Sequence, residues 1–129
     1  MALSATWEGL ILQIATGQVA HSTFTPQLAL YTTMPTMPAG TGGVEVSGGA
    51  YARQNCVFGA PTGSGPAVSS NSALITFPTA TANWGTIVGM GIIDASGNII
   101  DASTLQTSKT IGTGDVFSVP IGNYTINQT

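Results

Sequence analysis

The chain has 129 residues, which fits one folded domain, and only 5% of them are charged, against about 25% in an average protein. Two basic side chains and a net charge of −3 exclude binding to nucleic acid and to an anionic membrane surface, because both need a basic footprint. Gly, Ser and Thr replace the charges. We therefore expect partners to cover much of the surface, with a partner-free, Ser/Thr-rich β-domain as the alternative.

A single cysteine, Cys56, excludes an internal disulfide and indicates a small buried apolar side chain. The apolar run 10–12 is too short for a signal sequence or a membrane span, and no basic segment precedes it. We expect a cytosolic product that folds as one domain over 1–129, with an N-terminal helix or arm over 1–17 and a β-sandwich over 18–129.

Residues 4–15 form the one helix that the sequence predicts. Ser4 is placed to cap the helix and Gly17 to end it. Apolar side chains recur at helical spacing and form one stripe, made of Leu3, Trp7, Leu10, Ile11 and Ile14. Such a stripe packs either on its own domain or on a neighbouring subunit, and both alternatives stay open.

The rest of the chain alternates short apolar strands with turns that are rich in Gly, Pro and Ser. The predicted strands are 27–32, 50–58, 73–77, 85–94, 98–102, 115–119 and 123–127, separated by loops over 34–43 and 59–72 and a turn region over 109–114. The glycines of 85–94 leave room for a bulky ring, with Trp84, Tyr51 and Phe77 as candidates. This spacing predicts a mainly β fold, a jelly-roll-like β-sandwich with a short N-terminal helix.

The segment 44–58 organises the predicted sandwich, because it holds one of two basic residues, Arg53, and one of five acidic residues, Glu45. A guanidinium group forms several directed hydrogen bonds. We therefore expect Arg53 to tie loops together, with Tyr51 packed beside it. Trp84 is either a core residue, which we favour, or an exposed anchor.

Groups that carry catalytic or metal chemistry are scarce. His21 is the only histidine and lies far from Cys56 in the sequence, which argues against a metal site. Asp94 and Asp101 flank a predicted hairpin, where a carboxylate pair would suit acid–base chemistry or glycoside cleavage. Aspartates beside tight turns more often cap their own backbone. We therefore expect no enzymatic activity, no cofactor and no metal.

Four motifs follow one another over residues 42–115: GGVEVSGGAYARQ (42–54), ITFP (75–78), ATANWGT (80–86) and KTIGTGD (109–115). The start MALS (1–4) and the predicted helix after it fit the same pattern, so the match covers nearly the whole chain. In these motifs the chain resembles a family of small virion structural proteins of tailed bacteriophages. Proteins of this kind include tail-fibre-like proteins and capsid cement or decoration proteins with a jelly-roll fold. The resemblance implies a component of the phage particle, made in the host cytoplasm.

Our main hypothesis from the sequence is a capsid cement protein, which binds the outer face of the head at capsomer junctions and stabilises it. Its partners would be the major capsid protein and further copies of itself, as a dimer or trimer. The expected contact residues are Trp7, Leu10, Ile11, Ile14, Met34 and Met37. The alternative is a tail fibre or baseplate protein that helps recognise the host through its Pro/Gly loops. An enzyme that degrades host polysaccharide is a third hypothesis.

Overall fold

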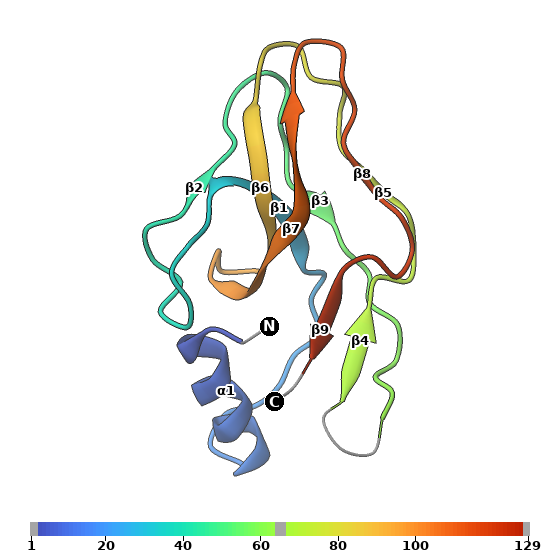
Figure 1. Cartoon of the computed structure of the whole chain (residues 1–129). Helices are drawn as coiled ribbons and strands as arrows, with labels where there is room; N and C mark the ends of the chain where they lie inside the picture. Colours follow the sequence, from blue (N-terminus) through green and yellow to red (C-terminus); the bar gives the residue numbers. More distant parts are fainter. Residues whose placement is uncertain (1–2, 64–66, 128–129) are drawn as a thin grey trace.

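A computed structural model describes residues 3–63 and 67–127 of the chain (Figure 1). Within these ranges one helix precedes nine strands. Their bounds are α1 (Ala5–Ala15), β1 (Gln27–Thr33), β2 (Val44–Glu45), β3 (Gln54–Asn55), β4 (Val68–Ser70), β5 (Ile75–Thr76), β6 (Gly85–Ile93), β7 (Ile99–Ile111), β8 (Ser118–Val119) and β9 (Thr125–Asn127). The mainly β fold with one short helix confirms the predicted fold class at this coarse level.

The helix α1 begins and ends where its local sequence predicts. Ser4 caps the N-terminus, because its Oγ accepts a hydrogen bond from the backbone N of Trp7 at 3.3 Å. Gly17 follows the last turn with a φ of +76°, a conformation that glycine adopts without strain. The backbone N of Ser4 also donates to the carbonyl of Ile100 at 2.8 Å, which fixes the start of the helix to β7.

The largest sheet has the strand order β2-β1-β6-β7, with β3 also paired to β1, and all its pairings are antiparallel (Figure 1). β1 and β6 lie at its centre, where Leu28 faces Ile92 and Leu30 faces Met90. These four side chains are buried in one cluster, so they define the core face of the sheet.

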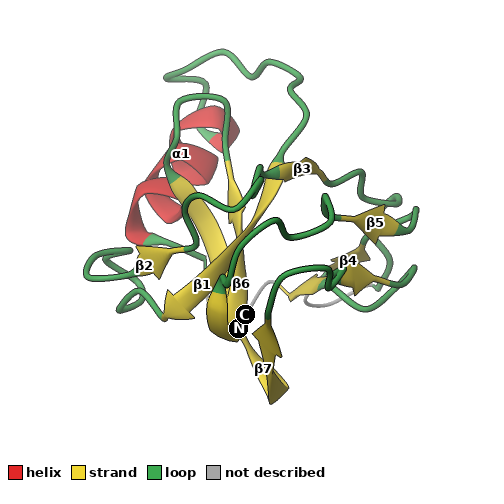
Figure 2. Cartoon of the chain, turned by 90° about the horizontal axis from the view of Figure 1, so that it is seen from above, coloured by secondary structure: helices red, strands yellow, loops and turns green. Residues whose placement is uncertain are grey.

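Two short sheets, β4 with β9 and β5 with β8, form a second layer along one side of the large sheet (Figures 1 and 2). The main core lies between the layers, where Phe77 and Phe117 from the second layer join the core face of the large sheet. A smaller cluster of Ala29, Tyr31 and Ile93 covers the opposite face. The finer prediction of a jelly-roll topology stays a prediction.

β6 departs from simple alternation. The register with β7 shifts on either side of Val88, so Ile87 joins the main core together with Ile92. Strict alternation along the strand would place Ile87 on the same face as Gly89 and Ile93, but the register shift places it with Met90 and Ile92 in the main core.

The glycines of β6 make room for side chains other than those expected. A Cβ at Gly91 would lie 2.7 Å from Cε2 of Tyr31, and one at Gly89 would collide with the sulfur of Met34. The close neighbours are therefore Tyr31 and Met34 on the smaller cluster. The three rings proposed for this position belong to the main core or pack against it: Trp84, Tyr51 and Phe77.

Three segments differ from their predicted state. Only Gln54–Asn55 of the predicted strand 50–58 pairs in the sheet, because the chain turns before it and Ala50 has a φ of +67°. The predicted turn 109–111 continues β7, paired with the start of β6. The predicted loop 59–72 contains β4. Neither the end of β7 nor β4 was predicted, because both are rich in Ser and Thr and lack the apolar alternation that indicates a strand.

Candidate functional site

Glu45, Tyr51 and Arg53 form a hydrogen-bonded cluster beside β2. Arg53 holds both carboxylate oxygens of Glu45, with Nε to Oε2 at 2.9 Å and Nη2 to Oε1 at 2.8 Å. The Tyr51 hydroxyl donates to Oε2 of Glu45 at 2.6 Å and accepts from the backbone N of Leu30 at 3.0 Å. The cluster thereby joins β1, β2 and the segment that leads into β3.

The same contacts fix the charges of the cluster. Burial alone would raise the pKa of Glu45, but the hydrogen bonds from Arg53 and Tyr51 outweigh it and lower the pKa below its usual 4.5. Burial, followed by the hydrogen bond to Glu45, raises the pKa of the Tyr51 hydroxyl, which stays a neutral donor. An ion pair with its hydrogen bonds satisfied in this way holds these segments together.

Trp84 is buried in the main core. Its Nε1 donates to the carbonyl of Gly49 at 2.8 Å, and its ring meets that of Tyr51 edge to face, with centroids 5.4 Å apart. Gly49 has a φ of +58°, and a Cβ there would lie 2.9 Å from Nε1 of Trp84. Of the two roles left open by the sequence, core and exposed anchor, the structure therefore places Trp84 in the core.

The apolar stripe of α1 turns toward its own domain, but the domain does not bury it. Trp7 packs on the ring of Phe24, with centroids 5.7 Å apart, and its Nε1 donates to Oδ2 of Asp94 at 3.0 Å. None of the eleven residues of α1 is fully buried. All five members of the stripe are half-buried: Leu3, Trp7, Leu10, Ile11 and Ile14. The helix is thus anchored at Trp7 and keeps accessible apolar surface along its length.

An apolar groove of about 310 Å³ lies beside this stripe, between α1 and the β4–β9 sheet. We call it the α1 groove, and its lining residues are Leu3, Trp7, Ile11, Pro61, Ala67, Val68, Ser69, Ile100 and Ile126. Ser69 is the one polar residue in this described lining, which contains no charged side chain. A space of this kind accepts apolar side chains, so the α1 groove is a candidate assembly surface.

The two loop methionines do not project as an exposed pair. Met34 is half-buried and packs on the smaller cluster beside Tyr31, directly over Gly89. Met37 is also half-buried. Gly89 provides the space into which Met34 folds back onto the domain, and the role of Met34 and Met37 as contact residues stays a prediction.

Asp94 and Asp101 have different environments. Oδ1 of Asp94 accepts from the backbone N of Ser96 at 2.9 Å and of Asn98 at 2.8 Å, so Asp94 caps its own turn as predicted. Asp101 is fully buried, and its Oδ2 accepts from the Tyr124 hydroxyl at 2.8 Å. Burial raises the pKa of Asp101 to about 6, although the hydrogen bond from Tyr124 offsets part of the effect.

Asp101 belongs to a buried polar group that the sequence did not predict. Its Oδ1 has no hydrogen-bonding partner among the described residues. Tyr124 is held in turn by Asn71, whose Oδ1 accepts from the backbone N of Tyr124 at 2.9 Å. This arrangement connects β7 to the second layer. Among the described residues Asp101 is fully covered, so this polar group lies inside the core.

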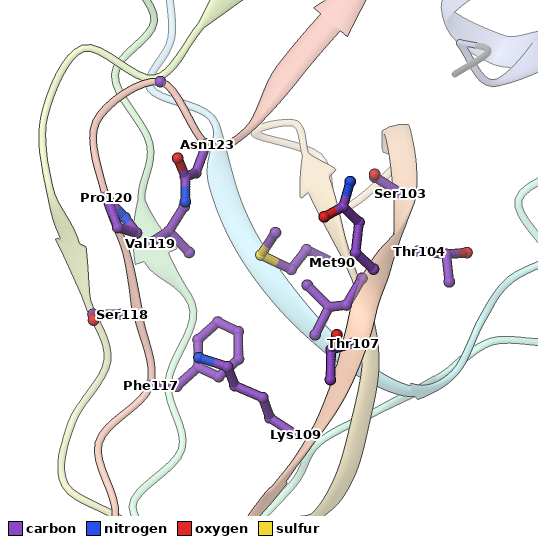
Figure 3. Close-up of a pocket in the computed structure, with 13 residues that line it drawn as sticks. Met90, Ser103, Thr104, Thr107, Lys109, Phe117, Ser118, Val119, Pro120 and Asn123 are labelled. Carbon is purple, nitrogen blue, oxygen red and sulfur yellow. The ribbon is translucent and has the colours of Figure 1, made fainter.

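A polar groove of about 850 Å³ separates β7 from the segment 117–123 (Figure 3). Its lining residues are Met90, Ser103, Thr104, Leu105, Gln106, Thr107, Lys109, Phe117, Ser118, Val119, Pro120, Gly122 and Asn123. Figure 3 shows Asn123 on one wall, pointing toward the gap, and Thr107 and Lys109 on the other, with Met90 between them. Thr104 and Ser118 point away from the gap. Hydroxyl, amide and ammonium groups thus surround an apolar floor.

A large bulge in β7 shapes this groove. Ile87 pairs with Lys109 and Gly89 with Thr104, so a single β6 residue, Val88, lies opposite the four β7 residues 105–108. The extra length moves this part of β7 away from regular pairing and re-aims its side chains. The Lys109 ammonium consequently lies over the ring of Phe117, 5.7 Å from its centroid.

Sequence reasoning missed the polar groove entirely. One wall comes from residues 103–109, to which the sequence assigned no element before the predicted turn at 109, and the other from residues 117–123, and no motif connects them. Among the residues that the structure describes, no three His, Cys, Asp or Glu side chains gather as a set of metal ligands. No helix within the described ranges has the length and apolar character needed to cross a membrane.

The comparisons with known proteins place the chain in a family. No curated protein matches it. A family model described as podophage GP4 fiber I protein gp80 matches residues 2–127, which is nearly the whole chain. This match confirms the resemblance to virion structural proteins of tailed phages, and with it a role as a component of the phage particle. The chain therefore belongs to the family of the podophage GP4 fiber I protein gp80.

Proposed function

We propose that this chain is a structural subunit of a phage fibre, without enzymatic activity, that assembles with copies of itself and takes part in host recognition. The observation that carries the proposal is the family match over residues 2–127, because the family is described as a fiber protein. The same description favours the fibre over the capsid cement protein that we expected first, and over a location on the head exterior.

The α1 groove supports the assembly part of the proposal. It is apolar, uncharged along its described lining and flanked by a helix with no fully buried residue. The chain offers matching apolar groups close by, since Val19 and Phe24 are exposed just after α1. We propose a second copy of this chain as the occupant of the groove. Burial of such groups at a subunit contact would provide the driving force.

Immunogold labelling of intact particles tests the location. Antibody raised against this chain should place gold on fibres, and gold scattered over the head would reject the fibre in favour of the cement hypothesis. Removal of the labelled fibres by shear, followed by a search for the chain in the sheared fraction, provides a second reading of the same location.

Self-association is tested with two neighbouring leucine-sized side chains on one helix. Ile11 lines the α1 groove, whereas Leu12 points outward and is 66% exposed. In sedimentation experiments, Ile11→Ser should weaken association at least about fivefold, as expected for loss of an interface anchor worth about 1 kcal/mol. Leu12→Ser is the matched control within α1. Equal weakening by both variants, or none by Ile11→Ser, would reject the groove as the assembly surface.

A further inference from the structure

The polar groove between β7 and 117–123 contains hydrogen-bonding capacity that the fold does not use. Gln106, Thr107 and Asn123 line it, and their side chains form no hydrogen bond to another protein group within the described part of the chain. All three are exposed. By contrast, other polar side chains of this protein, such as Asn71, are hydrogen-bonded into the fold.

Because of the bulge in β7, the wall of the polar groove presents side chains rather than a row of free backbone groups. An extended peptide would need a regular row of free backbone groups along the edge of β7. The four residues 105–108 interrupt that row, because they lie opposite the single residue Val88. The bulge therefore works against an added strand and presents the side chains of Gln106 and Thr107 at the groove.

The groups in the groove define the chemistry of its ligand. Amide and hydroxyl side chains both donate and accept hydrogen bonds, which matches adjacent hydroxyl groups on a sugar ring. No carboxylate lines the described groove, so a metal cation finds no suitable ligand set there. Lys109 is the one charged residue in the lining and would pair with an acidic group. The volume of about 850 Å³ lies within the range of ligand sites, roughly 300–1,000 Å³.

We propose that the polar groove binds a short saccharide, held by Gln106, Thr107 and Asn123, with Lys109 paired to an acidic group of the sugar. This inference builds on the host-recognition part of the proposed function. An open groove with few polar contacts gives weak binding for each subunit, with a Kd of about 1 mM. Repetition of the subunit along a fibre raises the apparent affinity through multivalency.

A glycan array tests the proposal on the full chain. The protein is biotinylated enzymatically on a C-terminal tag, which leaves the ammonium of Lys109, the only lysine, unmodified. It is then displayed on streptavidin to provide multivalency and applied to an array of neutral and acidic bacterial surface glycans. We expect a subset to be bound. Asn123→Ala and Gln106→Ala should each reduce the signal at least tenfold on that subset. Lys109→Gln should reduce it for the acidic members and leave the neutral members unchanged.

The controls use side chains that touch the groove without facing it. Thr104→Ala and Ser118→Ala remove hydroxyl groups that point away from the gap (Figure 3), so both should bind like the wild type. Thermal unfolding of every variant verifies the fold. The proposal is overturned if the wild type binds no glycan, or if Asn123→Ala and Gln106→Ala bind as well as the controls. Immunogold labelling tests the location separately. The two experiments together therefore distinguish a fibre protein that binds no saccharide from a saccharide-binding protein that is not part of a fibre.

Discussion

From the buried carboxyl of Asp101 we predict that the free energy of unfolding falls as the pH rises through the weakly acidic range. Its carboxyl is fully buried, with one hydrogen bond from Tyr124 and one oxygen unpaired among the described residues. Burial raises its pKa from 3.8 to about 6. The unfolded chain therefore loses this proton at a lower pH than the folded chain. Between these two values the folded state binds more protons, so the free energy of unfolding falls as the pH rises.

The size of the effect follows from the shift. A difference of about two pKa units corresponds to roughly 3 kcal/mol between the acidic and neutral limits, of which about 2 kcal/mol is lost between pH 4.5 and pH 7. Glu45 acts with the opposite sign, because its lowered pKa contributes stability that disappears as the pH falls below 4.5. Because Glu45 and Asp94, whose pKa is also lowered, keep their carboxyl groups in an Asp101 variant, the difference in slope between the wild type and that variant isolates the contribution of Asp101.

Urea unfolding at several pH values from 4.5 to 7, followed by tryptophan fluorescence, measures this slope. The wild type should lose about 2 kcal/mol over the range. Asp101→Asn keeps the size of the side chain and still accepts a hydrogen bond from the Tyr124 hydroxyl, but it does not titrate. The part of the pH slope that Asp101 contributes to the free energy of unfolding should therefore vanish. Tyr124→Phe removes the hydrogen bond that favours the charged form of Asp101. It should therefore raise the pKa of Asp101 and move the loss of stability to higher pH. Equal slopes for wild type and Asp101→Asn would refute the reasoning.

Two further predictions concern the cluster at Glu45 and the packing of β6. Glu45→Gln should lower the free energy of unfolding by about 2 kcal/mol at pH 7, since the bonds from Arg53 then lose their charged acceptor; an unchanged urea midpoint would argue against this role. Gly91→Ala should cost about 1–3 kcal/mol because its Cβ meets the ring of Tyr31. Gly9→Ala, at an open position in α1, should raise the free energy of unfolding by about 1 kcal/mol in the same assay. If Gly91→Ala and Gly9→Ala changed the free energy of unfolding in the same direction, the packing argument would be contradicted.

Local signals were enough for the helix and the longest apolar strand. Ser4 and Gly17 define the ends of α1, and the apolar run 85–93 defines β6 within one residue of the prediction. These elements carry their information in neighbouring residues: a capping hydroxyl, a glycine with positive φ, and a continuous apolar segment. Such features do not depend on where the rest of the chain lies.

The missed features depend on contacts between distant segments. Ser, Thr and Gln make up four of the seven residues 105–111 in the second half of β7, and the end of this half, 109–111, is a strand because β6 pairs with it. Asp101 resembles a turn aspartate in sequence, but its environment is set by Tyr124, 23 residues later. The polar groove requires both the bulge at 105–108 and the position of 117–123. No single stretch of the sequence contains this information.

The outer edge of β7 limits the ways in which the proposed self-association could occur. β7 ends the large sheet, and a free edge invites the addition of another strand. Its first residues are covered by the N-terminal segment, through the bridge between Leu3 and Asp101. The residues beyond carry the bulge at 105–108, which disrupts the row that an added strand would need. Assembly by strand addition is therefore disfavoured at this edge.

The α1 groove then offers the stronger basis for assembly, through apolar side chains rather than backbone. It shares no lining residue with the polar groove. A subunit that uses the first groove for a second copy thus keeps Gln106 and Asn123 free for a saccharide. The two proposals make a joint prediction: Ile11→Ser should lower the avidity of glycan binding by the free chain in solution, yet leave the affinity of a single subunit unchanged. A loss of single-subunit affinity in that variant would show that the two surfaces are not independent.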